Sequence, residues 1–272
     1  MSTEESVYIH GTTSEEQQRL SKLNELLNNA CIEALKVKKG DRILDIGSGL
    51  GQFSRRMAKE SETKVLGIER DASQRLKAIE FAEEQGEIEL AEFRAGDALA
   101  LPLSTEELGT FDIVFTRFVL EHVKHPEHVV TEMLKAVRPG GRIVVCDDDH
   151  ASFMPTPTPF GFPALWDAYI RSYDRLGNDP YIGRHLVELL HAAGLKQIRN
   201  QLIFFGGCAH EEKFDLVADN LIGILQGAKH FMLQEQLIDE RMFAQGIAGL
   251  EFWRQQPDAA LWYGICWAEG MS

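Results

Sequence analysis

Clustered glycines near residue 47 are the clearest candidate for chemistry in this chain. The run Asp45-Ile46-Gly47-Ser48-Gly49-Leu50-Gly51-Gln52 stands between a predicted strand and a predicted helix. Glycines let the backbone pass close to a ligand, and the start of a helix offers it free N–H groups. A dinucleotide fingerprint, G-x-G-x-x-G, would need glycine at position 52, where this chain has Gln52. Asp45 either caps backbone N–H groups of this loop or touches the ligand.

Two further acidic residues follow the next predicted strands. Glu69 ends the second strand, where a carboxylate can accept hydrogen bonds from both hydroxyls of a ribose. Asp97 and Ala98 follow the third strand, where a short acid and a free N–H suit the edge of an adenine. The alternative for Asp97 is a turn residue. Three matched strand ends, taken in order, favour an adenosyl ligand.

Histidines and a run of acids supply the candidates for proton transfer. His122 and His10 are candidate general bases, although a lone histidine more often has a structural role. The run Asp147-Asp148-Asp149-His150 would attract a cationic amine or a metal, or would form a solvated loop. We take Asp147 as a catalytic candidate and Asp148 as a candidate for substrate binding. Because the nine histidines show no H-x-x-x-H or His/Cys clustering, we expect no metal site.

Alternating strands and helices must position these residues. Apolar residues at helical spacing follow a capping box at Ser14 and predict an N-terminal helix. Beyond it, short apolar runs alternate with helix-length segments, which implies βαβ crossovers and a parallel sheet covered on both faces. Such sheets bind ligands at the carboxyl ends of their strands. The predicted strands are Arg42–Ile46, Lys64–Glu69, Glu87–Arg94, Phe111–Phe115 and Arg142–Cys146, and the predicted helices are Gln52–Glu60, Ser73–Gln85 and Pro126–Val137.

The second half of the chain is less regular and predicts a cap over the ligand edge of the sheet. Met154–Pro159 is too rich in proline for a helix or a central strand, and an aromatic stretch follows it. We predict a helix at Tyr181–Ala193, strands at Leu202–Phe205 and Leu261–Trp267, and helices between those strands. The expected domains are an N-terminal helical lid (1–36), a ligand-binding core (37–150), a Pro/aromatic cap segment (151–180) and the C-terminal part of the core (181–272) with a helical cap insertion at about 206–256.

Composition and charge exclude several classes of protein. Among 272 residues, 28 Lys and Arg stand against 42 Asp and Glu, a net charge of −14, so nucleic acid is a poor partner. No apolar stretch reaches the length of a membrane span, and the acidic start is unlike a signal peptide. The four cysteines are widely spaced, which favours reduced thiols. We therefore expect a cytoplasmic protein without a membrane partner.

Jointly, these motifs resemble those of the class I S-adenosylmethionine-dependent methyltransferases. The resemblance covers about residues 37–148. It implies an α/β fold with a Rossmann-like, doubly wound, mostly parallel seven-stranded sheet, helices on both faces and a helical cap. The matching stretches are Leu44–Gly51, Gly67–Glu69, Gly96–Ala98, Phe111–Val114, Leu120–Val123 and Val137–Arg142.

The resemblance also implies which residues bind S-adenosylmethionine, the methyl donor that becomes S-adenosylhomocysteine. The glycine loop would surround the methionine part, Glu69 would bind the ribose, and the turn after the third strand would contact the adenine. Tyr8 and Arg19 resemble a lid that closes over the carboxylate end. The implied cofactor-binding residues are Tyr8, Arg19, Gly47, Ser48, Gly49, Gly51, Gln52, Glu69, Arg70, Asp97, Ala98 and Arg117.

The methyl acceptor is less well defined by the sequence. The length of the cap and the absence of a basic tract favour a methyltransferase that acts on an O or N atom of a small molecule, a product of secondary metabolism. The alternatives are a C-methyltransferase of a quinone-like ring, a protein methyltransferase and, from another class, a catalytically silent module that binds the cofactor. An NAD-dependent oxidoreductase is disfavoured by Gln52. The candidate substrate-binding residues are Asp148, Phe153, Trp166 and Tyr181.

Overall fold

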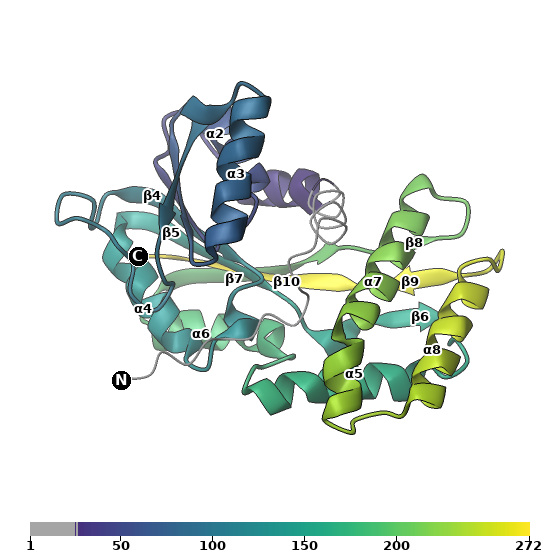
Figure 1. The fold of residues 1–272 in the computed structure, drawn as a ribbon. Coiled ribbons are helices and arrows are strands. Elements are labelled where there is room, and N and C mark those ends of the chain that lie inside the picture. Colours follow the sequence, from purple (N-terminus) through teal and green to yellow (C-terminus); the bar gives the residue numbers. More distant parts are fainter. Residues whose placement is uncertain (1–24, 26) are drawn as a thin grey trace.

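A seven-stranded sheet forms the centre of the molecule (Figure 1). The computed structural model describes residue 25 and residues 27–272. The strand order is β3-β2-β1-β4-β5-β10-β7, and neighbouring strands are parallel except that β10 runs antiparallel to both β5 and β7. This is the doubly wound, mostly parallel sheet that the sequence predicts. The strands are β1 (Ile43–Ile46), β2 (Val65–Glu69), β3 (Ala91–Ala95), β4 (Phe111–Arg117), β5 (Val137–Asp147), β7 (Lys196–Phe204) and β10 (Gly264–Met271).

Helices cover both faces of this sheet, as βαβ crossovers require. The helical residues 27–35 and the helices α2 (Gln52–Ser61) and α3 (Ala72–Glu84) pack on one face. The opposite face carries α4 (Pro126–Ala136) and α6 (Leu186–Ala192). Within the described residues, no helix is both long enough and apolar enough to cross a membrane.

The alternation of side chains along β1 decides which residues face which helices. Ile43 belongs to the apolar cluster that includes α2, whereas Leu44 and Ile46 belong to the cluster on the α4 side. Since side chains alternate along a strand, Asp45 points to the α2 face together with Ile43. There it meets Ser54 of α2, whose hydroxyl donates a hydrogen bond to the Asp45 carboxylate at 2.5 Å.

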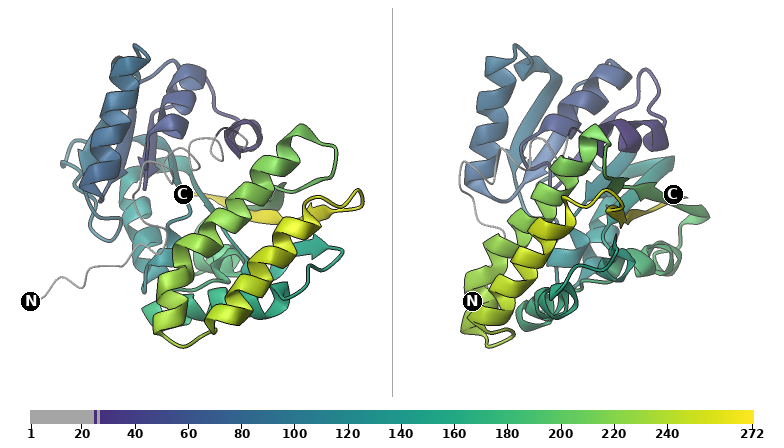
Figure 2. Two further views of the ribbon diagram at one scale, coloured as in Figure 1. Left: turned by 45° about the vertical axis from the view of Figure 1, so that its right-hand side comes forward. Right: turned by 90° about the vertical axis from the view of Figure 1, so that its right-hand side faces the viewer.

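Segments that are far apart in the sequence form a cap at one end of the molecule (Figures 1 and 2). Its three helices pack against one another, and its three short strands form a small antiparallel sheet in the order β6-β9-β8. The helix α5 lies within the segment 151–180, and α7 and α8 lie within 206–256. The elements are α5 (Phe162–Leu176), α7 (Glu212–Gln234), α8 (Glu240–Trp253), β6 (Met154–Thr156), β8 (Gly207–Cys208) and β9 (Ala260–Trp262).

Several predicted boundaries were wrong. The expected final strand is divided at Tyr263 into β9, which belongs to the cap, and β10, which belongs to the main sheet. The strand β7 begins at Lys196 rather than Leu202, because an edge strand can carry the polar side chains of 196–201 on its exposed surface. The predicted helix at Tyr181–Ala193 is a 3₁₀ turn, η4 (Ile182–His185), followed by α6. The predicted helix start at Ser14 lies outside the described residues.

An ion pair between β3 and the loop before β4 leads to a prediction about acid stability. The two terminal nitrogens of Arg94 donate to the Glu107 carboxylate at 2.8 and 2.9 Å, and this pair holds the Glu107 pKa at about 2. A lowered pKa stabilises the fold above the ordinary glutamate pKa, and this contribution disappears as the pH falls toward 2. We expect Glu107→Gln to cost about 1 kcal/mol at pH 7, because solvent screens this partly exposed pair.

Urea unfolding from pH 7 down to pH 3 measures this effect. The stability difference between wild type and Glu107→Gln should shrink steadily below pH 4.5. Glu84→Gln, at an exposed acid of α3, is the control and should leave the unfolding midpoint unchanged. A Glu107→Gln deficit that is the same at pH 7 and pH 3 would contradict the assigned charge interaction.

Candidate active site

The glycine loop between β1 and α2 is held against the neighbouring strand. The backbone N–H groups of Gly47 and Ser48 both donate to the carbonyl oxygen of Ile68, at 2.8 and 3.1 Å. A Cβ atom at Gly47 would lie 2.3 Å from the side chain of Val119, which follows β4. The loop therefore packs directly on the segment after β4.

Glu69 lies at the end of β2, beside this loop, and is 9% exposed. One carboxylate oxygen accepts a hydrogen bond from the Gly49 N–H and the other from the Asp71 N–H, both at 2.8 Å. Burial raises the pKa of Glu69, and the two backbone donors oppose that rise. Each oxygen keeps a lone pair for a further donor, so the carboxylate is positioned at the rim of the loop with capacity to bind hydroxyl groups.

Asp45 has a hydrogen-bond partner on α2. Its carboxylate accepts from the Ser54 hydroxyl and not from an N–H group of the glycine loop. Burial raises the pKa of Asp45 to about 6. The Asp45–Ser54 hydrogen bond links β1, which precedes the glycine loop, to α2, which follows it.

The donors and acceptors around the loop fit S-adenosylmethionine. The Ser48 hydroxyl oxygen is buried and has no hydrogen-bond partner among the described residues. The N-cap residue of α2, Gly51, has no side chain that could cap the first turn. Backbone N–H groups at a helix start attract carboxylates. Together with the Glu69 carboxylate, these groups match the amino-acid and ribose parts of the cofactor.

Other predicted cofactor residues have partners within the protein. The Asp97 carboxylate accepts from the Leu99 N–H at 2.9 Å, as a turn residue does, and Ala98 packs on the α4 side of the sheet. The Arg117 guanidinium donates to the Asn28 side-chain oxygen at 3.0 Å and lies 4.8 Å from the ring centre of Phe53. Arg70 is exposed and Gln52 is half-buried at the first position of α2. Tyr8, His10 and Arg19 lie outside the described residues.

An aromatic pocket opens at the carboxyl ends of β4 and β5, and side chains of α5 and α7 also line it. Its empty space is about 760 Å³, a volume that includes open solvent at its mouth. Of the predicted substrate residues, Asp148, Phe153 and Trp166 line it. Tyr181 does not belong to the lining, and its ring instead lies 4.8 Å from the Arg184 guanidinium. The lining residues are Leu27, Phe118, Glu121, His122, Asp148, His150, Phe153, Trp166, Tyr169, Tyr173, Phe205, Val217, Asn220, Ile224, Tyr263 and Ile265.

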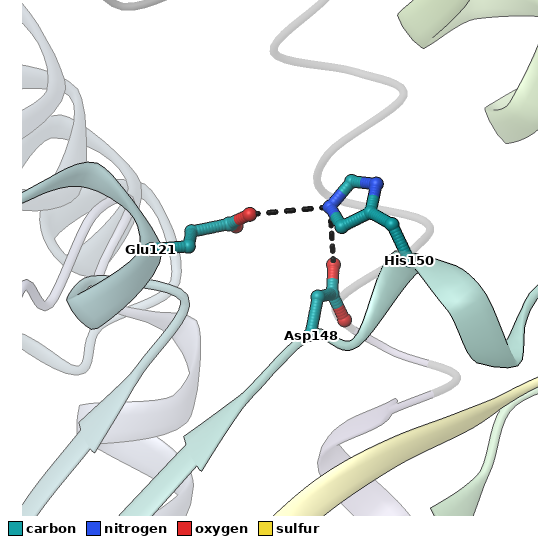
Figure 3. Close-up of side chains that lie close together, drawn as sticks. All are labelled: Glu121, Asp148 and His150. Carbon is teal, nitrogen blue, oxygen red and sulfur yellow. Dashed lines mark hydrogen bonds and ion pairs between the residues drawn. The ribbon is translucent and has the colours of Figure 1, made fainter. Parts of the chain in front are cut away.

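Three polar side chains of this pocket lie together: Glu121, Asp148 and His150 (Figure 3). The His150 Nε2 atom is 3.3 Å from Glu121 Oε2 and 4.0 Å from Asp148 Oδ2. Burial raises the pKa of Glu121 to about 8 and that of Asp148 to about 7. Burial also lowers the pKa of His150. All three shifts reflect ionisable groups held away from water.

The predicted catalytic residues are placed differently from one another. Asp147 is fully buried, and its carboxylate accepts from the backbone N–H groups of Val119, Leu120 and Asp148, so it shapes the turn after β4. His122 does line the pocket, where its ring stacks on Tyr173 at 6.1 Å. Burial lowers the pKa of His122 to about 4.

Glu121 is the site residue that the sequence alone did not single out, and His150 was noted only as the last residue of the acidic run after β5. Glu121 lies in the 3₁₀ turn η2 (Leu120–His122) and His150 begins η3 (His150–Ser152). These turns follow β4 and β5, which are neighbours in the sheet although thirty residues separate their ends in the chain. Comparing the polar residues that follow neighbouring strands would have paired Glu121 with His150, whereas their spacing along the chain does not.

Sequence comparison identifies the domain. Residues 37–169 match the family described as a methyltransferase domain. The 27-O-demethylrifamycin SV methyltransferase of Amycolatopsis mediterranei is 30% identical over 155 residues, which cover 57% of this chain and 54% of that protein. Norajmaline N-methyltransferase of Rauvolfia serpentina is 33% identical over 156 residues, or 56% of this chain and 52% of that protein. The chain thus spans about half the length of these curated relatives.

Solved structures share the fold. Phosphoethanolamine N-methyltransferase 2 of Haemonchus contortus, in complex with phosphomonomethylethanolamine and S-adenosylhomocysteine, has a TM-score of 0.61 at 15% identity and covers 98% of this chain and 61% of that one. The [4+2]-cyclase SpnF has a TM-score of 0.56 at 19% identity and covers 90% and 79%. At such identities the likeness concerns the fold alone. Residues 37–169 of this chain are therefore a methyltransferase domain, and the sheet has the class I fold that the sequence motifs imply.

Proposed function

We propose that this protein transfers the methyl group of S-adenosylmethionine to an oxygen or nitrogen atom of a small, ring-bearing molecule of secondary metabolism. The observation that carries the proposal is the aromatic pocket beside the glycine loop. Rings of Phe118, Phe153, Trp166, Tyr169 and Tyr173 line it. Pockets of this kind bind apolar, ring-bearing ligands and orient them through a few polar groups.

The contact between the glycine loop and the pocket wall supports this function. Gly47 packs on Val119, and the neighbouring residues Phe118, Glu121 and His122 line the pocket. A cofactor in the loop and an acceptor in the pocket would therefore meet at one edge of the sheet. The sulfonium methyl group is already electrophilic, so the protein has mainly to align the acceptor atom and to exclude water.

The names of the relatives support an O or N acceptor atom. The first relative is named 27-O-demethylrifamycin SV methyltransferase, and the second is named norajmaline N-methyltransferase. Each aligned part covers 57% of this chain or less. The pocket of this chain has to select its methyl acceptor, because a shared fold alone does not define a substrate.

A transfer assay with cofactor labelled in its methyl group tests the proposal. We expect the protein to release S-adenosylhomocysteine and to move the label into the small-molecule fraction of a metabolite extract, and excess S-adenosylhomocysteine should suppress the transfer. Label in the protein fraction would instead support the protein-methyltransferase alternative.

Cofactor binding without any transfer would overturn the proposal. That result would favour a binding module, or another reaction on this fold, for which the [4+2]-cyclase SpnF offers a precedent. Calorimetry with S-adenosylhomocysteine and with NAD, run on the same preparation, establishes first that the cofactor site is intact.

A further inference from the structure

The side chains of Glu121, Asp148 and His150 surround a gap of the size that a bare metal ion occupies. One ligand atom from each residue lies within 4.8 Å of the other two. Metal–ligand bonds of about 2.1 Å place neighbouring ligand atoms about 3.0–3.4 Å apart in tetrahedral or octahedral geometry. The His150–Glu121 separation of 3.3 Å already matches, and the His150–Asp148 separation of 4.0 Å requires only a small side-chain shift.

A buried oxygen of Asp148 points independently to a missing ligand. The His150 side chain is only 4% exposed, and its Nε2 atom faces the two carboxylates (Figure 3). The Asp148 Oδ1 atom is buried and has no hydrogen-bond partner within the described part of the chain. The His150 Nδ1 atom, on the other side of the ring, also has none. Buried polar atoms without partners are rare in folded proteins, and an ion or a water is a common explanation.

A tyrosine hydroxyl acts on each carboxylate. Tyr173 lowers the pKa of Glu121 and Tyr263 lowers that of Asp148, in both cases against the larger effect of burial. Groups of this kind orient metal ligands in characterised sites. The adjacent acid, Asp149, is paired instead with the Arg184 guanidinium through two hydrogen bonds of 2.7 Å.

Charge in the pocket also favours a cation. None of the described residues that line it is a lysine or an arginine. Two carboxylates that share a buried site repel each other unless a positive charge lies between them. A protonated amine would supply such a charge, but the imidazole nitrogen that faces the gap favours a metal, since neutral imidazole is a common ligand for divalent ions.

We propose that Glu121, Asp148 and His150 bind a divalent cation of the Mn²⁺, Co²⁺ or Zn²⁺ type. The donor set of two carboxylate oxygens and one imidazole nitrogen suits these ions and leaves coordination positions open toward the pocket. Resting on the proposed methyltransferase function, the site selects acceptors that carry a hydroxyl group able to bind the ion. This departs from the expectation of no metal site, which rested on histidine spacing along the chain, and it follows the alternative that the run Asp147–His150 attracts a metal.

Metal titration of the whole protein, freed of metal with a chelator and saturated with S-adenosylhomocysteine, tests the site. We expect one equivalent of Co²⁺ to bind with a visible absorption band, and Mn²⁺ and Zn²⁺ to compete for it. Glu121→Gln and Asp148→Asn should weaken binding by about 10- to 100-fold or more, the scale for disrupting a metal site. Asp149→Asn removes the neighbouring acid and should bind Co²⁺ as the wild type does.

Buried substitutions can disturb folding, so Tyr173→Phe provides a second test. It keeps the ring and removes the outer hydroxyl, and we expect about tenfold weaker Co²⁺ binding. Binding of S-adenosylhomocysteine reports separately that each variant is folded. No saturable Co²⁺ uptake by the wild type, or uptake unchanged in Glu121→Gln, would overturn the metal site.

The outcomes also separate this inference from the proposed function. Cofactor binding and methyl transfer without metal uptake would remove the metal site and leave the methyltransferase function intact. Metal uptake without methyl transfer would leave the metal site intact and remove the methyltransferase function. Binding of benzylamine, abolished by Glu121→Gln, with no binding of any of the three metals would show that the cluster is an amine site and would refute the metal assignment.

Discussion

Gly51→Ala should destabilise the fold by about 2–5 kcal/mol and weaken S-adenosylhomocysteine binding by at least about tenfold. Gly51 has a φ of 69°, and an alanine in the left-handed region costs about 1–2 kcal/mol. A Cβ atom there would also lie 2.2 Å from the Phe93 ring, and forcing such a core contact apart costs about 1–3 kcal/mol. The loop and the start of α2 would have to shift together, which moves the N–H groups that face the cofactor.

Gly86→Ala is a matched control for the backbone part of this effect. Gly86 has a φ of 67°, and a Cβ atom there would meet nothing within 4 Å. It should lose only the backbone contribution of about 1–2 kcal/mol and bind S-adenosylhomocysteine normally. Urea unfolding and calorimetry measure both variants. Equal losses of stability in the two would show that contact with Phe93 does not restrict the glycine loop.

Local patterns were sufficient to predict the central sheet. Clustered glycines after β1 and apolar runs such as Phe111–Phe115 indicate parallel strands, because a buried strand must be apolar on both faces. The comparisons and the sheet order confirm this part of the fold. The boundaries failed where a strand is little buried, as in β7, which lies at the sheet edge and buries only Ile203.

The cap and the polar cluster could not be derived from local spacing. The sequence places the aromatic stretch after Pro159 in the cap but does not predict its helical form, α5, which packs against α7 and α8. Glu121 and His150 meet only because β4 and β5 are adjacent in the sheet. Asp147 is the opposite case, since this conspicuous acid at a strand end is buried and accepts hydrogen bonds from three backbone N–H groups.

Glu69→Gln should weaken S-adenosylhomocysteine binding by about 10- to 100-fold, since a hydrogen bond to a charged group contributes about 1.5–3 kcal/mol. The substitution keeps the shape of the side chain and removes the negative charge that we expect to accept hydrogen bonds from the ribose. Glu92→Gln, at an exposed acid on the neighbouring strand β3, removes an equal charge and should bind as the wild type does.

The same carboxylate also anchors the Gly49 and Asp71 N–H groups, so weaker binding alone does not prove contact with the ribose. A ligand without the 2′-hydroxyl separates the two roles. The wild type should prefer S-adenosylhomocysteine over its 2′-deoxy analogue by about tenfold, the value of one hydrogen bond to a charged group. In Glu69→Gln that preference should largely vanish, because the charged acceptor is gone. If Glu69→Gln instead weakens the binding of both ligands by the same factor and keeps the preference, Glu69 organises the loop without touching the ribose.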